Sequence, residues 1–149
     1  MNPQRQSSFV DTNILVYAYD EDAGVRHDIA RDLLFQLWQD RAGMLSTQVL
    51  QEFYAVVTRK LKPPIPRAVA RLLVADFSHW CAVDTDPLLI ISASRLEEEH
   101  TLAFWDALIV EAARRAGATF LLSEDLQDGR KFGELTIRNP FQSLENSAG

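Results

Sequence analysis

The chain has 149 residues, of which 47% are hydrophobic, so it can bury one core and is too short for two ordinary domains. Its net charge of −6, with a pI near 5.0, argues against a simple basic nucleic-acid-binding protein. No apolar stretch approaches the roughly 20 residues of a membrane span, and residues 1–8 lack the apolar region of a secretory signal. We therefore expect one cytoplasmic domain over residues 1–149 that does not enter a membrane.

Hydrophobic periodicity predicts short strands that alternate with helices along the whole chain. The predicted strands lie at residues 9–10, 44–45, 81–83, 119–122 and 135–137. The predicted helices, the first of which follows its strand directly, lie at residues 11–19, 28–40, 48–61, 67–80, 87–99 and 104–116. The three tryptophans, Trp38, Trp80 and Trp105, fall in or beside these helices, where we expect them to pack in the core.

Capping and breaking residues define the ends of these helices. The signals are Gly43 as the break after the second helix, Ser46 and Thr47 as caps, the proline-rich turn 63–66, the cap pair Asp86–Pro87, and Gly117 as a stop. Because strands that alternate with helices form βαβ units, we predict an α/β fold with a mainly parallel central sheet in a three-layer α/β/α arrangement.

Two acidic residues follow predicted strands. Asp11 comes directly after the first strand, and Asp125 comes three residues after the strand at 119–122. In a parallel sheet, ligands gather at the carboxyl ends of the strands, so we expect both side chains at that edge.

Two further acids lie on apolar helix faces. Glu52 has Val49 and Val56 as helical neighbours, and Asp106 has Ile109 and Val110, so neither carboxylate has a basic partner on its own helix. A buried carboxylate without a partner is destabilising by several kcal/mol, and such a group usually has a tertiary partner, a raised pKa or a cation.

Each acid has an ordinary explanation when it is taken singly. Asp11 could only cap a helix, Asp106 could interact with a helix dipole, Glu52 could pair with a distant arginine, and Asp125 could be a polar loop residue. Four acids at one sheet edge would repel one another unless Mg²⁺ or Mn²⁺ neutralised them. Oxygen ligands without nearby His or Cys favour such a hard cation over zinc.

The order of these motifs resembles the PIN domain family, and specifically its single-domain VapC-type toxins from toxin–antitoxin systems. The resemblance covers nearly the whole chain. The matching segments are FVDTNILVYAYD, STQVLQEFYAVVTRK, FWDALIVEAARRAGATFLLSED and LTIRNPF.

Position by position, the resemblance implies metal binding and catalysis by Asp11, Glu52, Asp106 and Asp125. It also implies support from neighbouring polar residues. These are Thr12, Asn13 and Ser123. Asp128 could replace or assist Asp125, and the sequence does not choose between them.

The family is one of Mg²⁺- or Mn²⁺-dependent endoribonucleases, commonly inhibited by a cognate antitoxin and commonly dimeric. The resemblance therefore implies an RNA substrate, an antitoxin partner and a homodimer, with one or two ions left open. RNA binding also needs basic contacts, and the best cluster consists of Arg59, Lys60, Lys62, Arg67 and Arg71. A plain solvated face is an equal alternative for this cluster.

Two other functions compete with a nuclease. A catalytically silent binding module would keep the fold for partner recognition, but the acids at all four motif positions argue against it. A phosphatase of the haloacid dehalogenase type is suggested by Asp84–Thr85–Asp86 after a strand. The Asp–Pro helix cap already explains Asp86, and no downstream lysine or second motif of that class is apparent.

Overall fold

The computed structural model describes residues 6–147, with side chains as far as residue 144. Six strands form one sheet in the order β3-β2-β1-β4-β6-β5. Their bounds are β1 Ser8–Val10, β2 Gly43–Ser46, β3 Cys81–Val83, β4 Phe120–Leu122, β5 Lys131–Phe132 and β6 Leu135–Arg138. All neighbouring pairs are parallel except β5 and β6, so the predicted mainly parallel sheet is confirmed.

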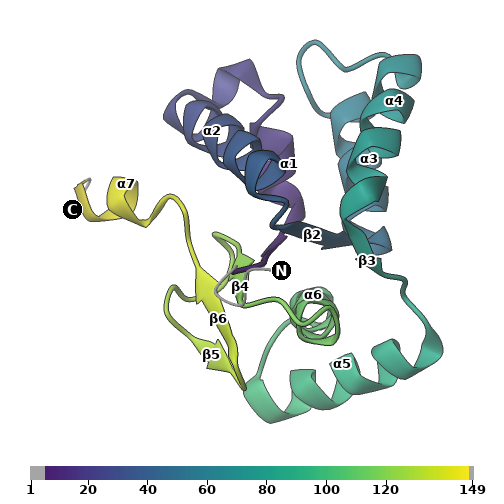
Figure 1. Ribbon diagram of the computed structural model, residues 1–149, viewed down its shortest axis with the longest axis vertical. Coiled ribbons are helices and arrows are strands. Elements are labelled where there is room, and N and C mark those ends of the chain that lie inside the picture. The colour runs from purple at the N-terminus through teal and green to yellow at the C-terminus, as the bar shows by residue number, and fades with distance from the viewer. Residues whose placement is uncertain (1–5, 148–149) are drawn as a thin grey trace.

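Helices cover both faces of this sheet, which confirms the three-layer arrangement. Figure 1 shows α1 to α4 on one side of the sheet, with α5 and α6 on the other. Their bounds are α1 Thr12–Tyr17, α2 Val25–Asp40, α3 Thr47–Arg59, α4 Arg67–Phe77, α5 Pro87–His100, α6 Phe104–Arg115 and α7 Gln142–Ser147, with short 3₁₀ helices at Glu21–Ala23 and Ser78–Trp80. None of the helices within the described residues combines the length and the hydrophobicity that a membrane crossing requires.

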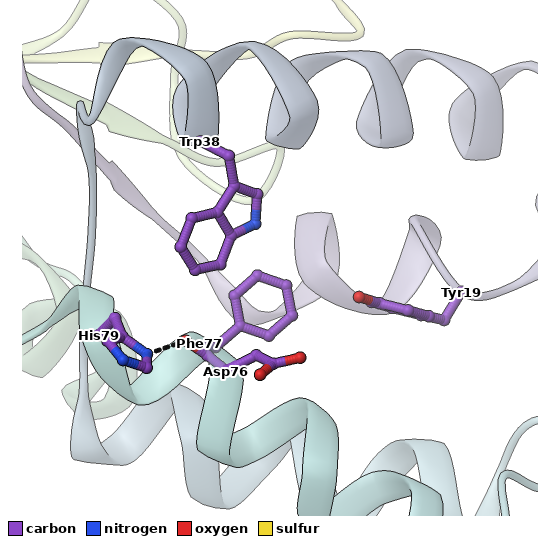
Figure 2. A pocket seen from close by; sticks show the side chains of 5 residues that line it. All are labelled: Tyr19, Trp38, Asp76, Phe77 and His79. Carbon is purple, nitrogen blue, oxygen red and sulfur yellow. Dashed lines mark hydrogen bonds between the residues drawn. The ribbon is translucent and has the colours of Figure 1, made fainter.

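Aromatic side chains join the helices on the α1–α4 side. The ring of Trp38 lies 5.9 Å from that of Phe77 and 4.6 Å from that of Trp80. Figure 2 shows the hollow of about 390 Å³ beside these rings, which is lined by Tyr19, Trp38, Asp76, Phe77 and His79. Aromatic pairs at these separations add to the stability that burial provides, so the cluster ties α2 to the end of α4.

Gly43 does not end the second helix, and this prediction is wrong. The helix ends at Asp40, and Arg41 caps it in the left-handed conformation, with φ of 52°. Gly43 instead begins β2, where a Cβ atom would lie 2.5 Å from Cε2 of Trp80. The glycine is needed because the indole ring occupies the space of a side chain.

Other boundaries also differ from the predictions. The second helix starts at Val25, three residues before the predicted 28, because the carbonyl of Gly24 accepts hydrogen bonds from the amides of His27 and Asp28. The fourth predicted helix, at 67–80, ends at Phe77 and continues as a 3₁₀ turn.

Two tryptophans predicted in the core are exposed to solvent, Trp105 over most of its surface and Trp38 in part. Trp105 is 64% exposed at the start of α6, and Trp38 is 40% exposed, whereas Trp80 is buried as predicted. Periodicity identifies the apolar face of a helix but does not reveal whether another element covers each turn of that face.

The C-terminal part has more structure than predicted. The strand expected at 135–137 is confirmed as β6, but it pairs with β5, an antiparallel strand of two residues that the sequence did not indicate. Helix α7 was also not predicted. Strands of two residues are too short to carry a periodic signal.

Candidate functional site

Two of the predicted acids, Asp11 and Asp125, lie at the carboxyl ends of the two central strands. β1 pairs with β2 on one side and with β4 on the other, so the chain leaves β1 at the point where the strand order reverses. Asp11 directly follows β1, and residues 123–125 directly follow β4. Ligand sites in open α/β sheets are typically found at such a position.

Asp11 is held on both sides by hydrogen bonds. Its Oδ1 accepts from the amide of Thr12 at 2.7 Å, which caps α1, and its Oδ2 accepts from the hydroxyl of Ser123 at 2.9 Å. Its own amide donates to the carbonyl of Leu122 at 3.0 Å. The Asp11 side chain thus caps α1, as expected, and also contacts the residue that follows β4.

The environment of Asp11 disfavours its charged form. Burial raises the pKa of Asp11, the hydrogen bonds from Ser123 and Thr12 lower it, and the negative charges of Asp125 and Glu52 raise it; together these effects raise the pKa to about 6. Desolvation and like charges both act in this direction, and a bound cation would oppose them.

Glu52 projects toward Asp11 from α3. Its Oε2 accepts a hydrogen bond from the hydroxyl of Thr12 at 2.8 Å, and its Oε1 accepts from Nε2 of Gln48 at 2.8 Å. Gln48 is buried one turn earlier on the same helix, and its own Oε1 has no hydrogen-bond partner within the described residues. The partners of Glu52 are therefore neutral, and the distant arginine considered above is absent from the described part of the chain.

Asp106 and Asp125 complete the group. Burial raises the pKa of Asp106, and the charges of Asp125 and Glu52 add to this effect. Burial also raises the pKa of Asp125, with a contribution from Glu124, and the Asp125 carboxylate accepts a hydrogen bond from Nδ2 of Asn13 at 3.0 Å. The two acids thus belong to one group of negative side chains.

The chemistry of this group suits a hard divalent cation. Its donors are carboxylate oxygens, and among residues 6–147 none of the four carboxylates forms an ion pair. Mg²⁺ and Mn²⁺ prefer such oxygen ligands. Within the same residues, however, no three His, Cys, Asp or Glu side chains are arranged so that they could hold an ion.

The supporting residues divide into two groups. Thr12, Asn13 and Ser123 all donate hydrogen bonds to the acids, at the positions expected of them. Asp128 does not join them, because its Oδ1 accepts a hydrogen bond at 2.8 Å from the amide of Asn139, near the C-terminus. Of the two candidates for a fourth acid, Asp125 is the one that the structure brings to the group.

The expected RNA-binding cluster lies where α3 ends and α4 begins. All five of its side chains are exposed, and within the described residues none of them forms an ion pair. They occupy the end of α3, the turn that follows it and the start of α4; these residues are Arg59, Lys60, Lys62, Arg67 and Arg71. Figure 1 shows this turn at the end of α3 that points away from the sheet.

Several contacts at the site were not predicted. Glu124 accepts hydrogen bonds from the hydroxyl of Tyr17 and from Nε of Arg26, and Gln48 binds Glu52. The four-residue spacing of Gln48 and Glu52 on a helix could have indicated their contact. Nothing in the sequence pattern links Glu124 to residues about a hundred positions earlier.

The aspartates that suggested a phosphatase have structural partners. Asp86 accepts from the amide of Leu89 at 2.8 Å as the cap of α5, and it forms an ion pair with Arg115 at 2.8 Å. The hydroxyl of Thr47 donates to Asp84 at 2.6 Å. These contacts account for both side chains without a phosphatase site.

Comparison with known proteins gives one match to a family and several to solved structures. Residues 8–130 match the model of the PIN domain. No curated protein matches. A toxin–antitoxin complex from Klebsiella pneumoniae is similar in structure, with a TM-score of 0.64 and 19% identity over 90% of this chain and 98% of that one.

Two further solved structures resemble the chain. VapC20 from Mycobacterium tuberculosis, a toxin that cleaves the sarcin–ricin loop, gives a TM-score of 0.58 and 22% identity, covering 87% of this chain and 99% of that one. VapBC2 from Rickettsia felis, bound to a DNA fragment from its promoter, gives a TM-score of 0.58 and 17% identity, covering 90% of this chain and 98% of that one. At these identities the likeness concerns the fold.

Proposed function

Because this chain belongs to the PIN domain family, we propose that it is a metal-dependent endoribonuclease and the toxin of a toxin–antitoxin pair. The observation that carries this proposal is the group of four acids at the carboxyl ends of β1 and β4 and on the adjoining helices α3 and α6, none of which forms an ion pair within residues 6–147. Like charges at such a place are typical of a site where a cation and a phosphate meet.

In this proposal, Asp11, Glu52, Asp106 and Asp125 hold Mg²⁺ or Mn²⁺. When bound, such an ion polarises the phosphate, lowers the pKa of a water molecule and offsets the negative charge of the transition state. Hydrolysis adds a water oxygen to phosphorus and releases the 3′ oxygen, so the products carry a 5′-phosphate and a 3′-hydroxyl.

The chain's own residues orient the acids for this task. Ser123 and the amide of Thr12 fix both oxygens of Asp11, so this carboxylate has one orientation. The hydroxyl of Thr12 also holds Glu52, and Asn13 holds Asp125. Asp11, Thr12 and Asn13 at the start of α1 thereby connect the acid on α3 with the acid after β4. Asp128 has no part in the site that we propose.

The partners and the location belong to the same proposal. RNA would contact the exposed basic cluster at the α3–α4 turn, and DNA is the poorer alternative. Structural neighbours that are toxin–antitoxin complexes support a cognate antitoxin as the protein partner. We further propose one domain over residues 1–149, a homodimer and a cytoplasmic location, where RNA and an antitoxin would both be present.

A silent binding module is the second candidate function. It is favoured by one observation, that no three acidic side chains within residues 6–147 are arranged to hold an ion. A nuclease must bring them together when the cation binds, whereas a silent module need not.

Cleavage of a mixed structured RNA by the purified protein tests the nuclease proposal. We expect cleavage with Mg²⁺ or Mn²⁺, none with EDTA, and a loss of at least roughly a hundredfold in Asp11→Asn, since removal of an electrostatic catalyst is typically destabilising to the transition state by about 3 kcal/mol. The matched control is Asp32→Asn, which neutralises an exposed aspartate of α2.

The three possible results separate the two candidate functions. Cleavage that requires the metal and Asp11 but tolerates Asp32→Asn supports the nuclease. Equal cleavage by Asp11→Asn would place the activity elsewhere or in a contaminant. No cleavage of total RNA despite cation binding would favour the silent module.

A further inference from the structure

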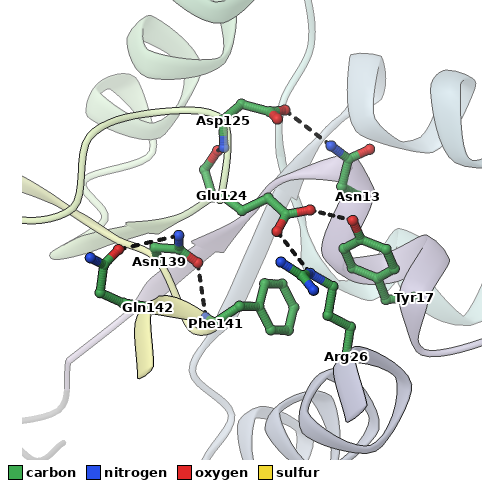
Figure 3. Close-up of polar contacts among 9 residues, drawn as sticks. Asn13, Tyr17, Arg26, Glu124, Asp125, Asn139, Phe141 and Gln142 are labelled. Carbon is green, nitrogen blue, oxygen red and sulfur yellow. Dashed lines mark hydrogen bonds and ion pairs between the residues drawn. The ribbon is translucent and has the colours of Figure 1, made fainter. Parts of the chain in front are cut away.

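Glu124 lies between Ser123 and Asp125 in the chain, yet its side chain turns away from the acid group. The hydroxyl of Tyr17 donates a hydrogen bond to its Oε1, and Nε of Arg26 donates to its Oε2 at 3.0 Å. Only 14% of the side chain is exposed. Figure 3 shows Glu124 directed toward Tyr17 and Arg26, while Asp125 is directed toward Asn13.

Residues 123–125 directly follow β4, and the chain bends at Glu124 and Asp125. The hydroxyl of Ser123 donates to Asp11 and accepts from the amide of Asp125 at 3.2 Å, and the Asp125 carboxylate accepts from Asn13. Glu124 points to the other side. Because Glu124 and Asp125 are adjacent in the chain, the contacts that hold Glu124 also restrict the backbone from which Asp125 projects toward Asn13.

The charge of Glu124 is neutralised where it lies. Its ion pair with Arg26 is mostly shielded from water, and such a pair is screened less than one at the surface. Burial, and next the hydrogen bond to Glu124, raise the pKa of Tyr17 to about 12, so its hydroxyl remains a donor at neutral pH. Glu124 therefore has two committed donors and is not available as a cation ligand in this arrangement.

The C-terminal segment packs against the same donors. The guanidinium carbon of Arg26 lies 5.4 Å from the ring centre of Phe141, and the ring of Tyr17 meets that of Phe141 edge to face at 5.4 Å. Phe141 is fully buried, and its amide donates to Oδ1 of Asn139 at 2.8 Å. Both residues lie beyond residue 130, where the match to the family ends.

We propose that Glu124 is a positioning residue for the metal site: Tyr17 and Arg26, backed by Phe141, hold its side chain so that Asp125 faces the other acids. This inference rests on the metal site proposed above and assigns to Glu124, Tyr17 and Arg26 a role in cation affinity without contact with the cation. The four residues Tyr17, Arg26, Glu124 and Phe141 are here called the Glu124 anchor.

Calorimetric titration of Mn²⁺ into the full chain tests this role. The measurement compares the Mn²⁺ affinity of two variants with that of the wild type. Arg26→Gln removes a positive charge near the acids, so electrostatics alone would strengthen Mn²⁺ binding, whereas loss of positioning weakens it. Tyr17→Phe leaves the charge unchanged, so electrostatics alone predicts no effect. We expect both variants to bind Mn²⁺ on the order of tenfold more weakly, as is typical when groups behind metal ligands are removed.

Tyr54→Phe is the matched control, because the Tyr54 hydroxyl on α3 makes no hydrogen bond within the described residues. We expect its Mn²⁺ affinity to equal that of the wild type. Thermal unfolding of each variant in EDTA shows that it is folded before the titration. Tyr17→Phe is the milder change and keeps the test valid if Arg26→Gln fails to fold.

The results distinguish this inference from the proposed function. A wild type that binds no Mn²⁺ overturns both. A wild type that binds Mn²⁺, with Tyr17→Phe within about twofold of it or Arg26→Gln binding more tightly, overturns the positioning role alone. Variants that lose stability in EDTA but keep their Mn²⁺ affinity also overturn it, because the anchor would then be only structural.

Discussion

At the scale of single residues, Asp11 combines a local contact with a long-range one. One carboxylate oxygen caps the helix that follows, and the other accepts from Ser123 at the end of a different strand. Without a cation the buried charge is unfavourable, and for this reason chiefly the pKa of Asp11 is raised to about 6. This shift makes the stability of the metal-free protein depend on pH.

We predict that Asp11→Asn reduces the pH dependence of stability in EDTA. The pKa of Asp11 is raised from 3.8 to about 6 on folding, so protonation stabilises the folded state. This contribution is fully present below the unfolded-state pKa and is lost as the pH rises through about 6. A pKa shift of this size changes the free energy of unfolding by about 3 kcal/mol.

Urea unfolding of wild type and Asp11→Asn across this pH range is the measurement. Relative to the wild type, the free energy of unfolding of the variant should rise by up to about 3 kcal/mol as the pH increases from below 3.8 to neutral. A difference between the two proteins that stays constant with pH would show that Asp11 has an ordinary pKa in the folded state.

At the scale of elements, the site depends on which strands are neighbours. β1 and β4 are adjacent and parallel, so Asp11 and residues 123–125 emerge at the same edge of the sheet. α3 and α6 bring Glu52 and Asp106 to that edge as they start from it. β2, which leads into α3, is in turn fixed by the close approach of Trp80 to Gly43.

Gly43→Ala should therefore destabilise the fold. The new Cβ would lie 2.5 Å from the indole of Trp80, so the ring or the strand must move. Overpacking of this kind typically lowers the free energy of unfolding by about 1–3 kcal/mol. Urea unfolding measures the loss directly.

Trp80→Leu provides the control, since a smaller side chain leaves room for the Cβ. In a double-mutant cycle, Gly43→Ala should be less destabilising in the Trp80→Leu background than in the wild type. Additive effects of the two substitutions would mean that the contact does not explain the glycine.

At the scale of the whole molecule, charge is unevenly distributed over an acidic protein. The chain carries a net charge of −6, and its acid group lies at the sheet edge. The exposed basic cluster lies at the α3–α4 turn, which Figure 1 shows at the far end of α3. RNA bound at both places would have to follow α3 from the acids to the turn.

Arg67→Glu combined with Arg71→Glu should weaken RNA binding and lower its salt dependence. If each arginine contacts one phosphate of single-stranded RNA, the slope of log affinity against log salt should fall by about 1.4. Fluorescence anisotropy in the Asp11→Asn background measures binding without cleavage.

Arg31→Glu combined with Arg95→Glu is the control, because it makes the same change in net charge at two exposed arginines of α2 and α5. Its salt dependence should remain close to that of the parent protein. If the two double variants showed the same RNA affinity and salt dependence, the basic cluster would be a solvated surface without a role in RNA binding.

The alternation of strands and helices, the parallel sheet, and the placement of Asp11 and Asp125 after strands can all be predicted from the amino-acid sequence. These features follow from short-range patterns: periodicity, capping residues and the rule that parallel strands end at one edge. The same patterns placed Glu52 and Asp106 on helices without basic partners.

Which side chains meet depends on how the whole chain packs. The sequence predicts Gly43 as a helix breaker, whereas in the structure Trp80 fills the space beside it; it predicts Trp105 as a core residue, whereas 64% of this residue is exposed. Ser-Glu-Asp at 123–125 offers two adjacent acids, of which Asp125 contacts Asn13 whereas Glu124 contacts Tyr17 and Arg26. Such contacts join residues about a hundred positions apart, so they arise from packing of the whole chain and leave no local pattern in the sequence.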